Sequence, residues 1–207
     1  MLSTTSDTRK RKGDDQYHRE KSSSIISGFL DLPIFAFKNI LQETVRKVIT
    51  TIVVGETGSG KSTQLPQYLS EIFPSECIVC TQPRRVAAVS VALRVAHECS
   101  CTIGHKVGYS IRFDEKSSHH TKIKFVTDGI LLQEVRSDPN LQRYKVIILD
   151  EAHERSLQTD MLMGLIKLIQ HRRSDLRLVI MSATLDVDLF KQYFNVISCL
   201  PSYIGIT

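Results

Sequence analysis

The most informative segment of the chain reads Thr51-Ile52-Val53-Val54-Gly55-Glu56-Thr57-Gly58-Ser59-Gly60-Lys61-Ser62. Its first four residues form a continuous, mostly β-branched run, which is typical of a strand covered on both faces of a sheet. Residues 55–62 match the pattern G-x-x-x-x-G-K-[ST] at every fixed position, and a stretch of helix length, residues 61–72, follows directly. Strand, glycine-rich loop and helix in this order predict backbone amides that surround phosphate oxygens at a helix N-terminus.

The residues of this loop also predict how a nucleoside triphosphate would be held. We expect Lys61 to bridge the β and γ phosphates and Ser62 to place its hydroxyl on Mg2+, a cation that prefers oxygen ligands. The other expected nucleotide-binding residues are Gly55, Glu56, Thr57, Gly58, Ser59, Gly60 and Thr63. The alternative is a glycine-rich turn that binds no ligand.

Further apolar runs of strand length recur along the chain at 77–80, 123–126, 146–149 and 178–181, with another at 107–113 that is expected nearer a sheet edge. Helix-length stretches at 84–97, 128–135 and 156–169 alternate with them. In the last stretch, Leu157, Met161, Leu165 and Leu168 fall on one face, the pattern of an amphipathic helix. The alternation predicts one three-layer α/β domain with a mostly parallel central sheet.

An acidic pair, Asp150-Glu151, follows the apolar run at 146–149. Parallel α/β sheets place their ligands at the carboxyl ends of the strands, so this pair is expected beside the glycine-rich loop. We predict that Asp150 holds the Mg2+ and that Glu151, also near the metal, orients or deprotonates the attacking water. The alternative is an acidic pair that only stabilises the start of a helix.

With its neighbours, this pair reads Asp150-Glu151-Ala152-His153, which together with the loop resembles the DEAH-box subgroup of superfamily 2 RNA helicases. Other motifs of the first lobe of that family follow in order: residues 81–88 are similar to motif Ia, 127–132 to motif Ib and 182–184 to motif III. Residues 32–34 and 108–113 also resemble the family. The resemblance implies a RecA-like P-loop NTPase domain over residues 32–198, ATP and Mg2+ as cofactors, and RNA as partner.

The resemblance further implies roles for single residues. Contacts to the RNA sugar-phosphate backbone are carried over to Thr81, Arg84, Arg85, Arg112 and Thr127. Arg94 is similar to the arginine that stacks on adenine in the family, His153 to the residue that couples the nucleotide site to the second lobe, and Ser182 and Thr184 to residues that link hydrolysis to strand movement. From the residues alone, the more common alternative is that Arg84 and Arg85 form surface ion pairs.

Composition limits the remaining possibilities. The 207 residues are 42% hydrophobic and 24% charged, with a net charge of +5, which fits a globular chain with a mild preference for polyanions. Residues 1–24 are polar and predict a disordered tail, in which Arg9-Lys10-Arg11-Lys12 is either a nuclear import signal or an ordinary charged segment. We therefore expect a nuclear or nucleolar location, with the cytoplasm as second choice.

The cysteines and the apolar runs exclude two other roles. Five cysteines without a secretory signal indicate a reducing compartment, and Cys77-x-x-Cys80 lies within a predicted strand, where the two side chains would face opposite sides of the sheet rather than one zinc ion. No apolar run is long enough to span a membrane, so no membrane role is expected.

Residues 199–207 depart from the family pattern, and motifs of a second lobe do not follow motif III. We expect that a lone first lobe binds nucleotide weakly, hydrolyses it slowly if at all, and does not unwind duplexes, because the second lobe supplies arginine fingers. Two hypotheses result: the ATP-hydrolysing lobe of a DEAH-box RNA helicase, with protein activators as further partners, or a non-catalytic nucleotide- and RNA-binding product that regulates a full-length helicase.

Overall fold

A computed structural model describes residues 32–184, 190, 192–194 and 203–206 of the chain. The predicted tail at 1–24 and Cys199 lie outside the described residues. Eight strands form one sheet in the order β4-β3-β5-β2-β6-β7-β1-β8, and every neighbouring pair is parallel except β3 and β4. The strands are β1 (Thr50–Gly55), β2 (Cys77–Gln82), β3 (Val107–Ile111), β4 (Asp114–Lys116), β5 (Ile123–Thr127), β6 (Tyr144–Leu149), β7 (Arg177–Ser182) and β8 (Tyr203–Ile206).

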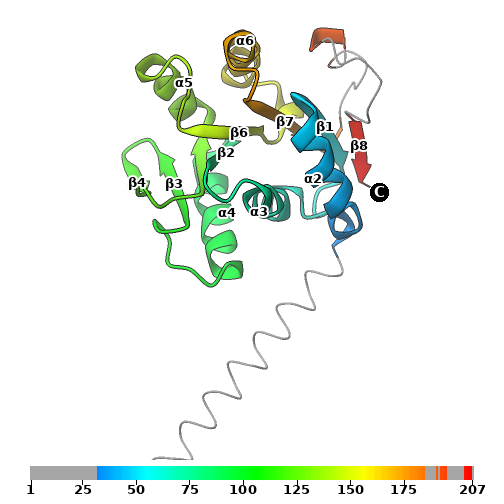
Figure 1. Ribbon diagram of the computed structural model, residues 1–207. Coiled ribbons are helices and arrows are strands. Elements are labelled where there is room, and N and C mark those ends of the chain that lie inside the picture. The colour runs from blue at the N-terminus through cyan, green and yellow to red at the C-terminus, as the bar shows by residue number, and fades with distance from the viewer. Residues whose placement is uncertain (1–31, 185–189, 191, 195–202, 207) are drawn as a thin grey trace, which may run out of the picture.

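Helices cover both faces of this sheet, as the two sides of the ribbon in Figure 1 show. One face packs against α2 (Lys38–Lys47), α3 (Lys61–Ile72) and α4 (Arg85–Glu98), and the other against α5 (Asp128–Ser137) and α6 (Leu157–Arg172). Two short 3-10 helices, η1 (Pro33–Phe37) and η2 (Ala152–Glu154), precede α2 and follow β6. The predicted three-layer α/β fold with a mostly parallel sheet is confirmed.

The continuous apolar runs form central strands because both of their faces are buried. Along β1, Ile52 packs into the core on the α5–α6 side and Val53 into the core on the α2–α4 side. Cys77 and Cys80 of β2 likewise belong to opposite cores, so one metal ion cannot bind both. Among the described residues, no group of three or more potential metal ligands is found.

The expected strands and helices occur with small shifts at their ends. The strand expected at 107–113 stops at Ile111, because Phe113 has a left-handed φ of 71° and turns the chain into β4, which pairs antiparallel with β3 at the sheet edge. The sequence did not predict β4 or β8. Within the described part of the chain, no helix has the length and apolarity needed to cross a membrane.

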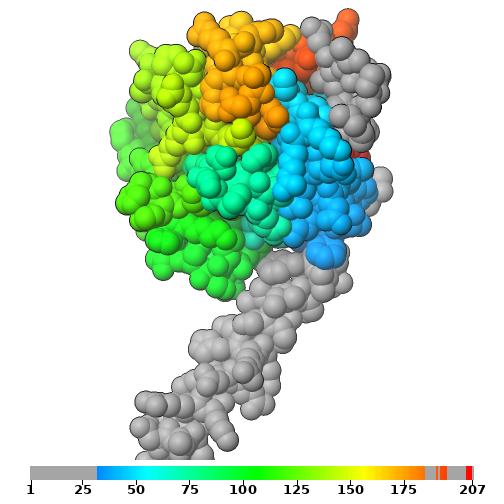
Figure 2. Space-filling view, viewed as in Figure 1, coloured from blue at the N-terminus to red at the C-terminus, as the bar shows by residue number. Residues whose placement is uncertain are grey.

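The face of α6 that packs on the sheet differs from the one that the sequence suggested. Of the stripe Leu157, Met161, Leu165 and Leu168, the first, second and fourth are exposed by 77%, 50% and 60%. The residues that reach the core are instead Leu162, Met163, Ile166 and Ile169. The helix is apolar on two adjacent faces, and Figure 2 shows it, in gold to orange, at the outer surface of the molecule.

Candidate active site

The glycine-rich loop joins β1 to α3 at the carboxyl end of the sheet. Gly58 and Gly60 have φ angles of 89° and 91°, in the left-handed region that favours glycine. Gly60 is the residue before the first turn of α3, and the amide of Gln64 donates to its carbonyl at 2.8 Å. The loop closes on itself through Ser59, whose amide and hydroxyl both donate to the carbonyl of Glu56.

Lys61 starts α3 with its side chain folded back into this loop. Its ammonium donates to the carbonyls of Gly55 and Glu56 and to the hydroxyl of Ser59, at 2.8 Å for Glu56 and 3.2 Å for Ser59. Burial lowers the pKa of Lys61, and the nearby carboxylates of Asp150 and Glu151 oppose that shift. A buried cation is therefore held at the centre of the loop, facing two acidic side chains.

Asp150 follows β6 and is 1% exposed. Its Oδ2 accepts from the side-chain amide of Gln82 at 2.5 Å, and its Oδ1 accepts from the backbone N–H of Glu151 at 2.8 Å. Burial raises the pKa of Asp150 to about 6, while the nearby hydroxyl of Ser62 opposes the shift. The structure thus brings Ser62, from the glycine-rich loop, together with Asp150, as the sequence predicted.

Glu151, His153 and residues 182–184 meet beside this pair. Glu151 has a left-handed φ of 52°, an uncommon angle that turns the chain sharply out of β6. The Nδ1 atom of His153 lies 3.5 Å from Oε2 of Glu151 and 3.5 Å from the amide nitrogen of Ala183. Nδ1 either accepts from Ala183 or, when protonated, pairs with Glu151, so His153 links the acidic loop to the end of β7. Ser182 is buried and donates to the carbonyl of Thr184 at 2.8 Å.

A hollow of about 310 Å³ opens above the loop, in the range that small-molecule sites occupy. The lining includes predicted nucleotide-binding residues from the loop, the acidic Glu151, and two residues of α4. The full lining is Leu32, Thr57, Gly58, Gly60, Lys61, Ser62, Thr63, Arg94, Glu98 and Glu151. Arg94, predicted from resemblance to stack on a base, therefore lies in the same hollow as the phosphate-binding loop.

The three predicted RNA-binding arginines gather at the ends of β2 and β3. Arg85 donates to the carbonyl of Arg112 at 2.8 Å, and the Arg112 guanidinium lies 4.8 Å from the centre of the Phe113 ring. Arg84 is exposed and pairs with Glu154 at 3.1 Å, which is the surface ion pair that the alternative interpretation expected. The arrangement presents guanidinium groups at the surface, where such groups can contact phosphates.

The two predicted RNA-binding threonines are placed differently. Thr81 is fully buried within β2, between β5 and β6, and its hydroxyl has no hydrogen-bond partner among the described residues. A central strand encloses this side chain, and the contact of Thr81 with RNA stays a prediction. Thr127, at the start of α5, is 9% exposed, so its side chain offers little surface.

Three residues of the site were missed by the sequence analysis. Gln82 holds Asp150, Glu154 pairs with Arg84, and Glu98 binds Arg94 at 2.6 Å. The spacing of Arg94 and Glu98, four residues apart on a helix, was a signal for the last contact. The other two contacts join segments that only the order of strands brings together.

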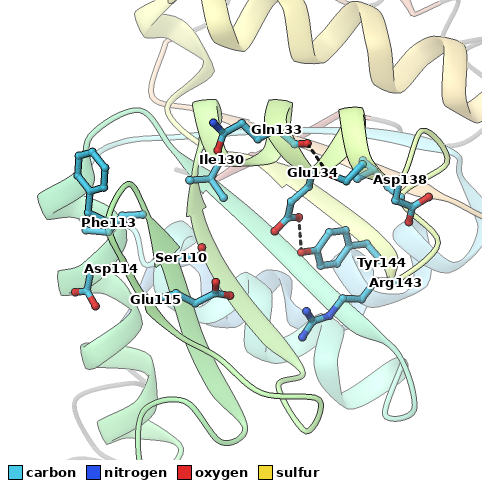
Figure 3. A pocket seen from close by; sticks show the side chains of 13 residues that line it. Ser110, Phe113, Asp114, Glu115, Ile130, Gln133, Glu134, Asp138, Arg143 and Tyr144 are labelled. Carbon is cyan, nitrogen blue, oxygen red and sulfur yellow. Dashed lines mark hydrogen bonds between the residues drawn. The ribbon is translucent and has the colours of Figure 1, made fainter.

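A second and larger hollow, of about 720 Å³, lies away from the loop between the β3–β4 edge and α5 (Figure 3). Glu134 projects into it and accepts from the Tyr144 hydroxyl at 2.6 Å. Glu134 also pairs with the buried Lys124 at 3.0 Å, and Lys124 pairs with Glu115 at 3.1 Å. None of the phosphate-binding residues lines this hollow, so the smaller hollow above the loop is the candidate active site.

Comparison with known proteins agrees with this geometry. Residues 36–191 match the family described as DEAD/DEAH box helicase. The chain is 52% identical over 168 residues to the human protein named "Probable ATP-dependent RNA helicase DHX35", a match that covers 79% of this chain and 24% of that protein. It is also 52% identical over 167 residues to the Caenorhabditis elegans homolog, with 79% of this chain and 23% of the homolog covered. The chain thus spans about a quarter of the length of these curated relatives.

Proposed function

Because the chain belongs to the DEAD/DEAH box helicase family, we propose that it is the ATP-binding and ATP-hydrolysing lobe of a DEAH-box RNA helicase. The observation that carries the proposal is that Lys61 and Ser62, which line one hollow, lie next to the buried Asp150. Two of the relatives are named probable ATP-dependent RNA helicases. In this role ATP hydrolysis is coupled to the binding and remodelling of RNA.

The loop residues would bind the phosphates. The oxygens that accept from Lys61, the carbonyls of Gly55 and Glu56, lie where the ammonium can exchange them for phosphate oxygens. Thr57, Gly58 and Gly60 line the hollow, and the N-terminus of α3 adds its positive dipole end.

The residues beside Lys61 fit a magnesium ion. Ser62 offers a hydroxyl oxygen and Asp150 a buried carboxylate, and hard oxygen donors are what Mg2+ prefers. Ser62 would hold the ion directly and Asp150 through water, with Glu151 near it. When bound, Mg2+ neutralises charge on the phosphates during transfer.

Glu151 is the residue that we assign to water activation. It lines the hollow and is the more exposed of the two carboxylates, so water can reach it. His153 contacts both Glu151 and the amide of Ala183, which supports a coupling role for His153, Ser182 and Thr184. A change in the position of Glu151 would therefore be transmitted through His153 to residues 182–184 at the end of β7.

RNA would contact the arginine surface at the ends of β2 and β3. Arg84, Arg85 and Arg112 offer donors to phosphates without reading sequence, and Thr127 lies in register with Gln82 on the neighbouring strand. On binding RNA, Arg84 would exchange Glu154 for a phosphate.

Protein activators are further partners in this proposal. The cluster Arg9-Lys10-Arg11-Lys12 supports a nuclear location. Alanine replacement of the cluster, followed by microscopy, would test that location.

The experiment that tests the proposal measures ATP binding and hydrolysis by the 207-residue chain, with and without single-stranded RNA. We expect Mg2+-dependent ATP binding that Lys61→Ala abolishes and that Lys47→Ala, a change at an exposed lysine on α2, leaves intact. Glu151→Gln is expected to retain binding and lose turnover. ATP binding that is unaffected by Lys61→Ala would refute the proposed site, and turnover that survives Glu151→Gln would refute the role of Glu151.

A further inference from the structure

Glu98, the last residue of α4, has a side chain that is only 3% exposed although it lies at the rim of the nucleotide hollow. Burying a carboxylate is costly unless donors compensate it. Three donors do so here. Oε2 accepts from the side-chain amides of Gln64 at 2.8 Å and Gln67 at 2.7 Å, and Oε1 accepts from Nε of Arg94 at 2.6 Å.

These contacts join the two helices that border the hollow. Gln64 and Gln67 belong to α3, the helix that begins at Lys61, whereas Arg94 and Glu98 belong to α4. Gln64 is also buried, and its backbone amide bonds to the carbonyl of Gly60 in the loop. The Glu98 carboxylate therefore has a fixed position relative to the phosphate-binding loop.

Arg94 takes its orientation from this fixed carboxylate. A guanidinium is planar, so a short bond from Nε restricts the direction in which the plane and the two terminal nitrogens point. The side chain of Arg94 is 64% exposed and lines the hollow together with Gly58 and Thr63. One edge of the guanidinium is thus bound to Glu98, while the rest of the group remains available to a ligand.

We propose that Glu98 is a positioning residue for nucleotide binding: its buried carboxylate holds the Arg94 guanidinium against the base of a nucleotide whose phosphates occupy the Lys61 loop. The proposal rests on the proposed ATP site. A free arginine samples many rotamers, and fixing it before the ligand arrives reduces the entropy lost on binding. Stacking of the planar cation on a base then contributes to affinity.

A purely structural role for Glu98, in which its contacts only hold α3 and α4 together, predicts a different effect of its substitution on ligand binding. Such contacts would support the loop as well as Arg94, so their loss would weaken the binding of phosphates and of whole nucleotides alike. Positioning of Arg94 affects only ligands that carry a base. Inorganic tripolyphosphate, which has the phosphates of ATP without the base, separates the two roles.

The test measures equilibrium binding of ATP and of tripolyphosphate, each with Mg2+, to the wild-type chain, Glu98→Gln, Arg94→Ala and the double variant. We expect Glu98→Gln to weaken ATP binding about tenfold, the effect of losing one hydrogen bond to a charged group, and to leave tripolyphosphate binding within about twofold. Arg94→Ala should do the same, and the double variant should lose no more than the stronger single variant. Glu43→Gln, which removes the charge from an exposed i,i+4 pair with Lys47 on α2, serves as the matched control and should change neither affinity.

Two results would overturn the positioning role: equal weakening of both ligands by Glu98→Gln, or losses from Glu98→Gln and Arg94→Ala that simply add. If Glu98→Gln does not fold, Arg94→Lys keeps the charge but lacks Nε, and wild-type ATP affinity in that variant would equally overturn it. Tripolyphosphate binding that survives Lys61→Ala would instead mean that the proposed site is wrong. The two failures are therefore distinguishable.

Discussion

Replacement of Gly60 by alanine should destabilise the chain more than the same replacement of Gly58, although the two glycines have nearly equal φ angles of 91° and 89°. A methyl group at Gly58 would meet no atom within 4 Å. At Gly60 the same group would lie 2.9 Å from Cγ2 of Ile34 and 3.0 Å from Cδ1 of Leu32. Ile34 is fully buried, so it has little room to yield.

The expected magnitudes follow from these contacts. Placing alanine in the left-handed region costs roughly 1–2 kcal/mol at either position. At Gly60, overpacking against the buried Ile34 of η1 adds about 1–3 kcal/mol. The effect of alanine on the unfolded chain is the same in both variants and cancels in the comparison.

Thermal unfolding of the two variants beside the wild type measures the difference. For a chain of this size, each kcal/mol corresponds to about 2–4 °C in Tm, so Gly60→Ala should melt several degrees below Gly58→Ala. Equal melting temperatures would refute the packing argument and leave only the backbone cost. A third variant, Ile34→Ala with Gly60→Ala, removes the clashing Cγ2, so its loss of stability should be smaller than the sum of the losses in the two single variants.

Three further predictions test other parts of the structure. Thr81→Val replaces a buried hydroxyl that has no partner among the described residues. It should therefore leave the free energy of unfolding in urea unchanged or raise it by up to about 1 kcal/mol, and leave RNA affinity unchanged. A loss of RNA affinity would instead support the contact predicted from the sequence. On α6, Ile166→Ala should lower the free energy of unfolding by about 2–5 kcal/mol, whereas Leu168→Ala, at a residue 60% exposed, should lower it by less than about 1 kcal/mol. Similar losses in the two variants would contradict the observed helix face. Burial raises the pKa of Asp150 from 3.8 to about 6, so the stability that its protonated form provides is complete below pH 4 and is lost as the pH rises through 6. The unfolding free energy of the wild type, relative to Asp150→Asn, should therefore fall by up to roughly 3 kcal/mol between pH 4 and 7 without magnesium. A difference between the two proteins that stays constant with pH would contradict the raised pKa of Asp150.

The central sheet could be predicted from the sequence because a strand that is buried on both faces consists of a continuous run of apolar residues. The sequence predicted the wrong face of α6 because that helix carries two apolar faces, of which only one touches the sheet. Periodicity counts apolar residues but does not distinguish a residue such as Leu168, which faces outward, from Ile166, which is buried. Only the angle at which the helix meets the sheet decides between them.

Motif matching predicted the loop, Asp150 and Glu151 because their chemistry depends on residue type and on the end of a strand. It also assigned an RNA contact to Thr81, whose side chain is fully buried. A strand alternates the direction of its side chains but can be enclosed on both faces, and β2 lies between β5 and β6 in the middle of the sheet. In such a strand, residues beyond its carboxyl end, such as Arg84, reach the surface, whereas Thr81 does not.

The strand order also explains the two contacts that join motif Ia to residues 150–154, the segment that follows β6. β2 and β6 are far apart in sequence but adjacent and parallel in the sheet, so their carboxyl ends emerge side by side. Gln82, the last residue of β2, therefore reaches Asp150, and Arg84 reaches Glu154. A ligand that draws Arg84 away from Glu154 frees a charge in the loop that carries Glu151, while Gln82 keeps Asp150 in place. Adjacency of two strands thus places the proposed RNA surface beside the proposed ATP site, an arrangement that neither motif contains by itself.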